Sequence, residues 1–118
     1  MSPSEESAPV APAPGVPVRG SATGRPVMAL LDLLGRRWAL RVLWELREGS
    51  LAFRALQGRC DGMSSSVLNQ RLSELREAGV IEHGEDGYRL SAEGRQLLPS
   101  LGELNAWAER WAERSRPE

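Results

Sequence analysis

The side chains with the most recognisable chemistry lie between Met63 and Val80, in the run MSSSVLNQRLSELREAGV. Serines at positions 64, 65 and 66 are followed by Asn69 and Gln70, and all five are polar without being charged. Asn and Gln form hydrogen bonds with base edges in the major groove of DNA, while Ser hydroxyls bind phosphates. These residue types favour DNA recognition, and the alternative is an ordinary solvated helix surface.

One helix, from about residue 64 to residue 78, would present these side chains together. Its apolar face repeats at helical spacing through Leu68, Leu72, Leu75 and Gly79. The opposite face carries Ser66, Asn69, Gln70, Ser73 and Glu77. Ser64 is a suitable N-cap, and Ala78-Gly79 is a typical helix ending. The pattern predicts a half-buried helix with a polar face near its N-terminus.

The segments on either side complete a DNA-binding motif. Residues 51–59 predict a short helix with Arg54 and Arg59 outward, and Cys60-Asp61-Gly62 predicts a tight turn. A short helix, a tight turn and an amphipathic helix together form a helix-turn-helix. Behind it, residues 80–83 and 88–90 predict two strands around the turn 84–87, which is a wing.

Three further residues of this motif are interpreted individually, two of them with an alternative. Arg89 is placed on the wing to reach a phosphate. His83 is interpreted as an exposed strand residue rather than a sensor. Cys60 is interpreted as a small apolar filler, the alternative being a redox-sensitive thiol whose oxidation would shift the recognition helix.

Two apolar helices outside the motif predict a subunit contact. The segment from Pro26 to Leu34 is apolar nearly all round and ends at Gly35, and a second helix is expected over residues 38–48. A last helix begins at Ser91 and has apolar residues at the spacing of a coiled-coil seam, with a kink or restart expected at Pro99. It would pack either on its own domain or, as we expect, on a second subunit. The expected dimerisation residues are Met28, Leu33, Leu34, Leu101, Leu104, Trp107 and Trp111.

Composition sets the broad class. A chain of 118 residues with 41% hydrophobic residues is expected to form one domain, over residues 25–118, after a flexible tail rich in Pro, Ala and Ser over residues 1–24. The tail lacks the basic residues around its prolines that a proline-rich ligand would carry. With one Cys and one His, no disulfide, metal site or cofactor is expected. No apolar run could span a membrane, so we expect a cytoplasmic protein without membrane contact.

The charge distribution and the absence of catalytic motifs limit the classes of function that the sequence allows. The net charge is −1, but residues 25–48 carry five Arg against three acids, whereas residues 81–118 carry five against eight. This moderate positive excess in the first half is compatible with DNA binding. The chain has no Gly-x-Ser-x-Gly motif and no phosphate-binding glycine loop. Enzymatic activity is therefore not expected.

Five short runs of sequence form a recognisable set. They are LLDLLGRRW (30–38), FRAL (53–56), MSSSVLNQRLSEL (63–75), EAGVI (77–81) and YRLSAEG (88–94). Together they resemble the HxlR-type bacterial transcriptional regulators, over roughly residues 26–111. The resemblance implies a homodimeric winged helix that is joined through its N- and C-terminal helices and binds promoter DNA.

The chain departs from this family pattern in two places. Family members commonly have a cysteine before the proline that opens the first helix, used in some of them for sensing, and this chain has Arg25 there. The wing turn, residues 84–87, is also shorter than is usual in the family. The resemblance therefore implies neither that sensing mechanism nor extensive wing contacts.

These observations predict a mainly α winged helix-turn-helix protein with a short β-hairpin. It would regulate transcription by binding a palindromic promoter site in double-stranded DNA as a homodimer. A small-molecule effector is compatible with this function, although no residue pattern identifies one. The alternative is a winged helix used for protein-protein contact. Ser66, Asn69 and Gln70 are expected to read bases, and the residues expected to bind the DNA backbone are Arg54, Arg59, Ser64, Ser65, Arg71 and Arg89.

Overall fold

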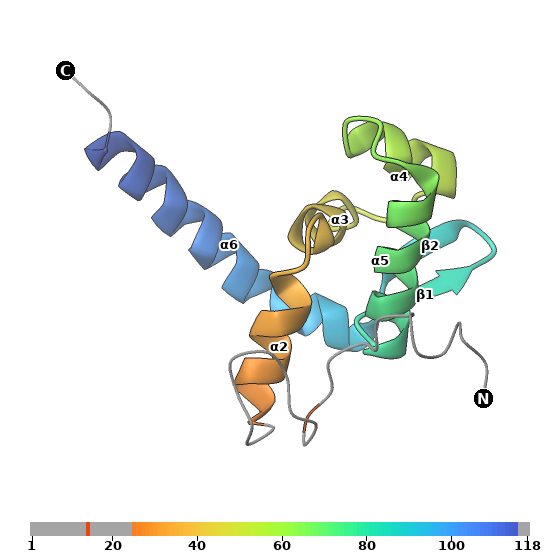
Figure 1. The fold of residues 1–118 in the computed structure, drawn as a ribbon, viewed down its shortest axis with the longest axis horizontal. Helices are drawn as coiled ribbons and strands as arrows, with labels where there is room; N and C mark the ends of the chain where they lie inside the picture. The colour runs from red at the N-terminus through yellow and green to blue at the C-terminus, as the bar shows by residue number, and fades with distance from the viewer. Residues whose placement is uncertain (1–13, 15–24, 116–118) are drawn as a thin grey trace.

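The computed structural model describes residue 14 and residues 25–115. The proposed tail, residues 1–24, therefore lies outside the described residues apart from Pro14. The described residues form helices and one hairpin in this order (Figure 1): α2 (Pro26–Leu34), α3 (Ala39–Glu45), α4 (Phe53–Arg59), α5 (Ser65–Glu77), β1 (Ile81–Gly84), β2 (Gly87–Leu90) and α6 (Ala92–Arg114). The predicted winged helix-turn-helix, mainly α with a short antiparallel hairpin, is confirmed.

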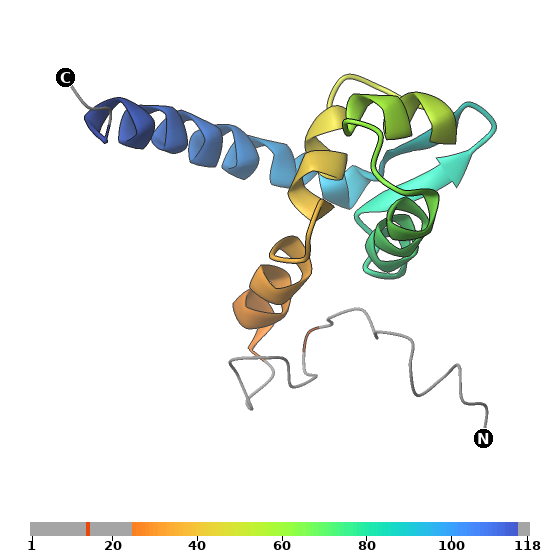
Figure 2. The ribbon, with the colours of Figure 1, turned by 45° about the horizontal axis from the view of Figure 1, so that its top comes forward.

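The core lies where α3, α4, α5 and the hairpin meet. Its fully buried side chains include Leu43, Leu46, Leu56, Leu68, Leu72 and Leu75. Three of these leucines belong to the predicted inner face of α5, which is confirmed. In Figures 1 and 2, α2 and the C-terminal part of α6 extend away from this body as two separate arms.

The ends of α5 follow from local sequence. The Ser64 hydroxyl accepts a hydrogen bond from the Val67 amide at 3.2 Å, which satisfies a backbone donor that the first turn leaves unpaired. Gly79 adopts a φ of 82°, and the Val80 amide donates to the Leu75 carbonyl at 3.1 Å. This bond closes the C-terminus in the way that glycine endings favour. The predicted helix over 64–78 is therefore confirmed, with Ser64 and Ala78 as its caps.

The helix expected over residues 51–59 begins only at Phe53. Leu51 instead pairs with Tyr88 of β2, through amide-to-carbonyl bonds of 2.9 and 2.8 Å. Gly87 permits this approach, because a Cβ there would lie 2.4 Å from the Leu51 carbonyl oxygen. The expectation of a helical residue 51 was wrong, because this long-range bridge takes the backbone into the wing.

Two further boundaries differ from the prediction. The second helix starts at Ala39 and ends at Glu45, and Trp38 precedes it in a left-handed conformation with φ 76°. Of the kink or restart expected at Pro99, the restart does not occur, since α6 continues through it to Arg114. Pro99 and Arg95 are both exposed, so water can satisfy the Arg95 carbonyl that the proline ring leaves without a donor. None of the described helices combines the length and apolar character needed to cross a membrane.

Candidate nucleic-acid interface

The turn between α4 and α5 aims the second helix outward. Asp61 and Gly62 have φ values of 58° and 69°, so the chain leaves α4 through two consecutive left-handed residues. The Gly62 amide donates to the Gln57 carbonyl at 3.1 Å. The Gln57 side-chain amide in turn donates to the Met63 carbonyl at 2.9 Å and to the Ser65 hydroxyl at 3.1 Å. The end of α4 is thereby tied to the start of α5.

The polar face of α5 is open. Ser66 and Asn69 are exposed, and Gln70 is half-buried. Within the described part of the chain, the side chains of Asn69 and Gln70 make no hydrogen bond, so their donors and acceptors are available to a ligand. These three residues share one side of a helix whose first turn is held by a cap. The arrangement matches that of a helix entering the major groove.

The serines before this face combine capping with exposure. Ser64 accepts from the Val67 amide, and its hydroxyl oxygen lies 3.4 Å from that of Ser66. Ser65 accepts from Gln57. A hydroxyl that accepts a hydrogen bond still has its own proton to donate. Ser64 and Ser65 are therefore able to cap or brace the helix and still donate to a phosphate.

The four candidate arginines differ in their surroundings. Arg54 is exposed and has no ion pair within residues 25–115. Arg59 lies 4.0 Å from Glu45 with 53% of its side chain exposed. Arg89 donates from Nε to the Glu82 carboxylate at 2.7 Å, directly across the hairpin, and this hydrogen bond raises the pKa of Arg89. Arg54 and Arg59, on α4, are thus the least restrained of the four.

Arg71 is engaged inside the protein, unlike the other three. Its Nε donates to the Arg37 carbonyl at 2.8 Å and its Nη1 donates to the Glu74 carboxylate, with only 14% of the side chain exposed. The side chain points inward from α5, toward the connection between α2 and α3. These contacts hold the recognition helix in place, and they leave little of the Arg71 side chain open to the phosphate contact that we predicted.

Arg71 belongs to a cluster that sequence reasoning missed. Glu74 on α5 is 4% exposed and pairs with Arg71 and, at 2.6 Å, with Arg36, which also contacts Asp32 at 3.3 Å. We call Asp32, Arg36, Arg71 and Glu74 the ion-pair cluster. A buried carboxylate is costly unless it is paired, and here two guanidiniums pair it. The available signal was an acidic residue next to Leu75 on the inner side of α5.

The exposed apolar side chains also differ from the residues that we expected at the subunit contact. Leu33 and Leu101 are 4% and 8% exposed and belong to the core of their own chain, and Leu34 packs against that core. The protomer itself buries Leu33 and Leu101, so neither is the exposed contact surface that we expected. Leu34 is half-buried, and its place in a subunit contact stays a prediction. Met28 is half-buried.

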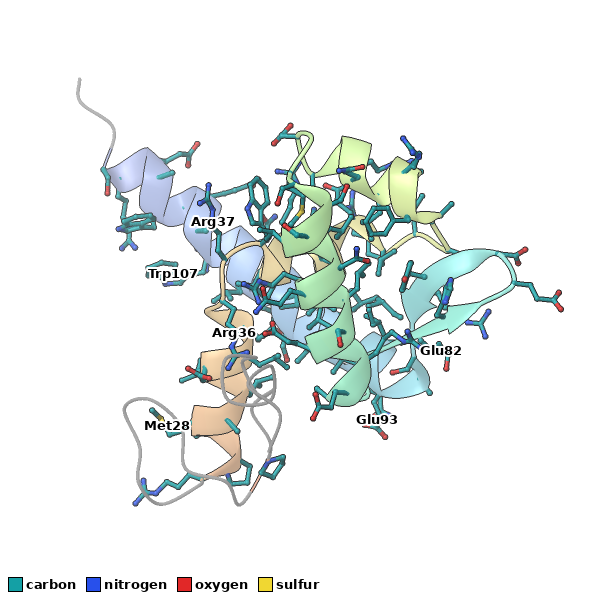
Figure 3. All side chains as sticks on the ribbon, turned by 45° about the vertical axis from the view of Figure 1, so that its right-hand side comes forward. Met28, Arg36, Arg37, Glu82, Glu93 and Trp107 are labelled. Carbon is teal, nitrogen blue, oxygen red and sulfur yellow. The ribbon has the colours of Figure 1, made fainter. Side chains whose placement is uncertain are left out.

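The large hydrophobic side chains that stay exposed lie on α2, α3 and α6. Leu104, Trp107 and Trp111 of the expected set are 55%, 49% and 55% exposed, and the two tryptophan rings stack with centroids 6.0 Å apart. Figure 3 shows Trp107 extending from the free part of α6 into solvent. Val27, Leu31 and Leu40, which sequence reasoning did not include, are 57%, 56% and 38% exposed. A groove between α3 and α6 joins part of this surface and is lined by Leu40, Arg41, Trp44, Leu101, Leu104, Asn105 and Ala108.

Cys60 lies inside the core. Its side chain is fully buried, and burial raises the pKa of the Cys60 thiol. A thiol that stays protonated and shielded is a poor nucleophile. The surroundings of Cys60 therefore agree with its interpretation as an apolar filler.

Comparisons of the sequence and of the structure with known proteins all point to one family of regulators. The sequence profile described as HxlR-like helix-turn-helix matches residues 33–116. The uncharacterized HTH-type transcriptional regulator YvaP of Bacillus subtilis (strain 168) is 32% identical over 92 residues, which cover 72% of this chain and 85% of that protein. The HTH-type transcriptional regulator YodB of the same organism is 27% identical over 89 residues, which cover 70% and 80%. The structure of quinone-bound YodB superposes with a TM-score of 0.67 at 27% identity, covering 71% of this chain and 96% of that one.

Proposed function

The chain belongs to the HxlR-like helix-turn-helix family and is a DNA-binding transcriptional regulator, and from this premise we propose that it binds a palindromic promoter site as a homodimer. The observation that carries the proposal is the open polar face of α5. The side chains of Asn69 and Gln70 make no hydrogen bond within residues 25–115 and lie beside Ser66 on that face. Their amides suit the paired donors and acceptors of adenine in the major groove.

The proposed contacts divide into two groups. Ser66, Asn69 and Gln70 read base edges. Ser64, Ser65, Arg54 and Arg59 bind the phosphates on either side, because the two serines begin α5, the two arginines lie on α4 of the same motif, and all four are exposed. Arg89 contributes from the wing, where it must share its guanidinium with Glu82. Arg71 is left out of the proposed contacts, since its side chain is engaged inside the protein.

The proposed dimer is supported by the free part of α6. Every residue from Glu103 to Ser115 is exposed, although Leu104, Trp107 and Trp111 lie among them. Together with Val27 and Leu31 on α2, they form more apolar surface than a small monomer commonly leaves in water. A two-fold dimer through these arms would present two copies of α5 to half-sites about 34 Å apart.

The proposal also covers the cellular compartment in which the protein acts and the kind of effector to which it responds. The protein would act in the cytoplasm, where bacterial promoters lie, and it would act through binding rather than catalysis. We propose no thiol-based sensing, because Cys60 is the sole cysteine of the sequence and is buried. A small-molecule effector would therefore act through non-covalent binding.

Selection of DNA fragments from a random library tests this function. The purified protein should enrich a sequence with two inverted half-sites. Asn69→Ala with Gln70→Ala should change the preferred sequence, by roughly 1 to 3 kcal/mol for each lost paired contact. Gln96→Ala, an exposed amide on α6, is the matched control and should leave the preference intact. An unchanged preference in the double variant would refute the base contacts, and failure of the parent to enrich any sequence would favour a protein-protein module.

A further inference from the structure

Glu74 is the one charged residue buried in the core of the described chain. It lies on the inner side of α5, so it cannot touch DNA in the proposed complex. Its two carboxylate oxygens are divided between two arginines, with Oε1 facing Arg71 and Oε2 lying 2.6 Å from Arg36. No described buried side-chain polar atom is left unpaired. The carboxylate is thus held from two directions at once.

The ion-pair cluster reaches from the recognition helix to α2. Arg36 follows α2 and contacts Glu74 through Nη1 and Asp32, in the last turn of α2, through Nη2. One guanidinium therefore joins the two helices, and Figure 3 shows Arg36 at this junction. Arg71 adds a second link, from Nε to the Arg37 carbonyl. The packing of α2 includes contacts with α3 and the apolar contact of Leu33 with the core, and the cluster adds a charged link from α2 to α5.

The connection between α2 and α3 is itself constrained. Trp38 has a φ of 76°, a conformation that is uncommon and unfavourable for a bulky side chain. The neighbouring Arg37 carbonyl is the one that Arg71 holds at 2.8 Å. Contacts from α5 therefore help to keep this connection in a shape that its own residues do not prefer.

We propose that Glu74 is a positioning residue that sets the orientation of the recognition helix relative to α2. A planar guanidinium bound to a carboxylate fixes both distance and direction, whereas apolar side chains can slide past one another. Buried ion pairs often add little net stability over apolar pairs, so the main contribution of this cluster is geometry. The inference rests on the proposed dimer. If α2 and α6 join the subunits, the cluster determines the separation of the two copies of α5.

The expected consequence is a strict half-site spacing. One extra base pair moves a half-site by about 3.4 Å and rotates it by about a tenth of a turn. The parent protein should therefore lose about tenfold or more in affinity when its selected half-sites are moved apart or together by one base pair. In Glu74→Gln, which keeps the shape but removes the charge, the loss should shrink to about threefold or less. Affinity for one isolated half-site should stay unchanged, because no DNA contact has been removed.

The experiment compares duplexes with graded spacing, using half-sites selected by the parent protein. Glu77→Gln is the matched control, since it removes one negative charge from the exposed end of the same helix and leaves the cluster intact. It should keep the parent spacing profile. If Glu74→Gln does not fold, Arg36→Lys replaces it, because lysine keeps a positive charge beside Glu74 but loses the planar fork that also holds Asp32. The affinity of Arg36→Lys should then also depend less on half-site spacing than that of the parent.

Three results would overturn the inference. Glu74→Gln could weaken binding equally at every spacing, which would indicate a purely structural role, or it could keep the parent profile. Arg36→Lys could keep the parent profile where Glu74→Gln is unfolded. By contrast, a parent protein that selects a single half-site without a paired one would overturn the proposed dimeric binding as well, so the two failures are distinguishable.

Discussion

Replacement of both tryptophans of α6 by glutamate should separate the subunits of the proposed dimer. Trp107 and Trp111 stack on each other on the free part of α6, where every described residue from 103 onward is exposed. Neither ring belongs to the core of its own chain. The double variant should therefore keep a folded core but lose the surface through which two copies associate.

The magnitude follows from the exposed fractions. The two tryptophans are 49% and 55% exposed, so a partner could cover about half of each, or about 100 Å² of a side chain that buries up to about 200 Å². At about 25 cal/mol per Å², this amounts to about 2.5 kcal/mol for each ring and about 10 kcal/mol for the four rings of a dimer. If half of that area is covered in the complex, the loss is about 5 kcal/mol, which corresponds to between about 10³- and 10⁴-fold in dissociation constant.

Sedimentation velocity across nanomolar to millimolar concentrations measures this change. The parent should be dimeric at micromolar concentration, and Trp107→Glu with Trp111→Glu should be monomeric and unable to bind paired half-sites. Single variants provide a matched pair, because Trp107→Glu and Ala106→Glu each add one negative charge to adjacent exposed positions. Only the first should weaken association. A monomeric parent at micromolar concentration would refute the proposed dimer, and a dimeric double variant would refute the assignment of α6 to its interface.

Two further predictions concern arginines and the thiol. Arg54→Ala should weaken binding to all DNA sequences by a similar factor and reduce the salt slope of affinity by about one per subunit. Arg71→Ala should leave that slope unchanged. It should instead lower the free energy of unfolding, measured by urea denaturation, by roughly 1 to 3 kcal/mol. A reduced salt slope in Arg71→Ala would contradict the structural role assigned to it. Cys60 should react with a thiol reagent only when the protein unfolds, since burial raises its pKa and shields it, and DNA binding should not respond to peroxide. A peroxide response in the parent that disappears in Cys60→Ser would show that the buried thiol is a sensor.

The parts of the fold that sequence predicted correctly depend on local rules. Ser64 and Gly79 mark the ends of α5 through capping bonds between residues a few positions apart. The leucine spacing of α5 identified its inner face, and the hairpin followed from a short turn between two β-prone runs. Each of these features is decided by residues within about one or two helical turns of each other. Sequence reasoning was reliable at that range.

The features that it missed depend on contacts between distant segments. Leu51 leaves the expected helix because it pairs with Tyr88, and nothing near Leu51 signals that partner. Glu74 and Arg36 are 38 positions apart. Leu33 and Leu101 were assigned to a subunit contact because helical spacing shows that a face is apolar without showing what covers it. Periodicity predicts burial, whereas only the packed structure separates burial within the chain from burial between chains.

The packing also explains how the two arms would bear on DNA binding in the proposed dimer. The arm α2 is fastened to α5 through Arg36 and Glu74. The arm α6 is fastened just beyond the same C-terminal end of α5, in whose last turn Glu74 lies. There the Ser91 hydroxyl donates to the Gly79 carbonyl at 2.5 Å and the Ser91 amide donates to the Val80 carbonyl at 3.1 Å. A Cβ at Gly94 would lie 2.0 Å from that Val80 oxygen, so α6 starts in direct contact with the chain that leaves α5. Because both arms are attached at the C-terminal end of the recognition helix, a change in how two subunits pack would have to move the two copies of α5 relative to each other.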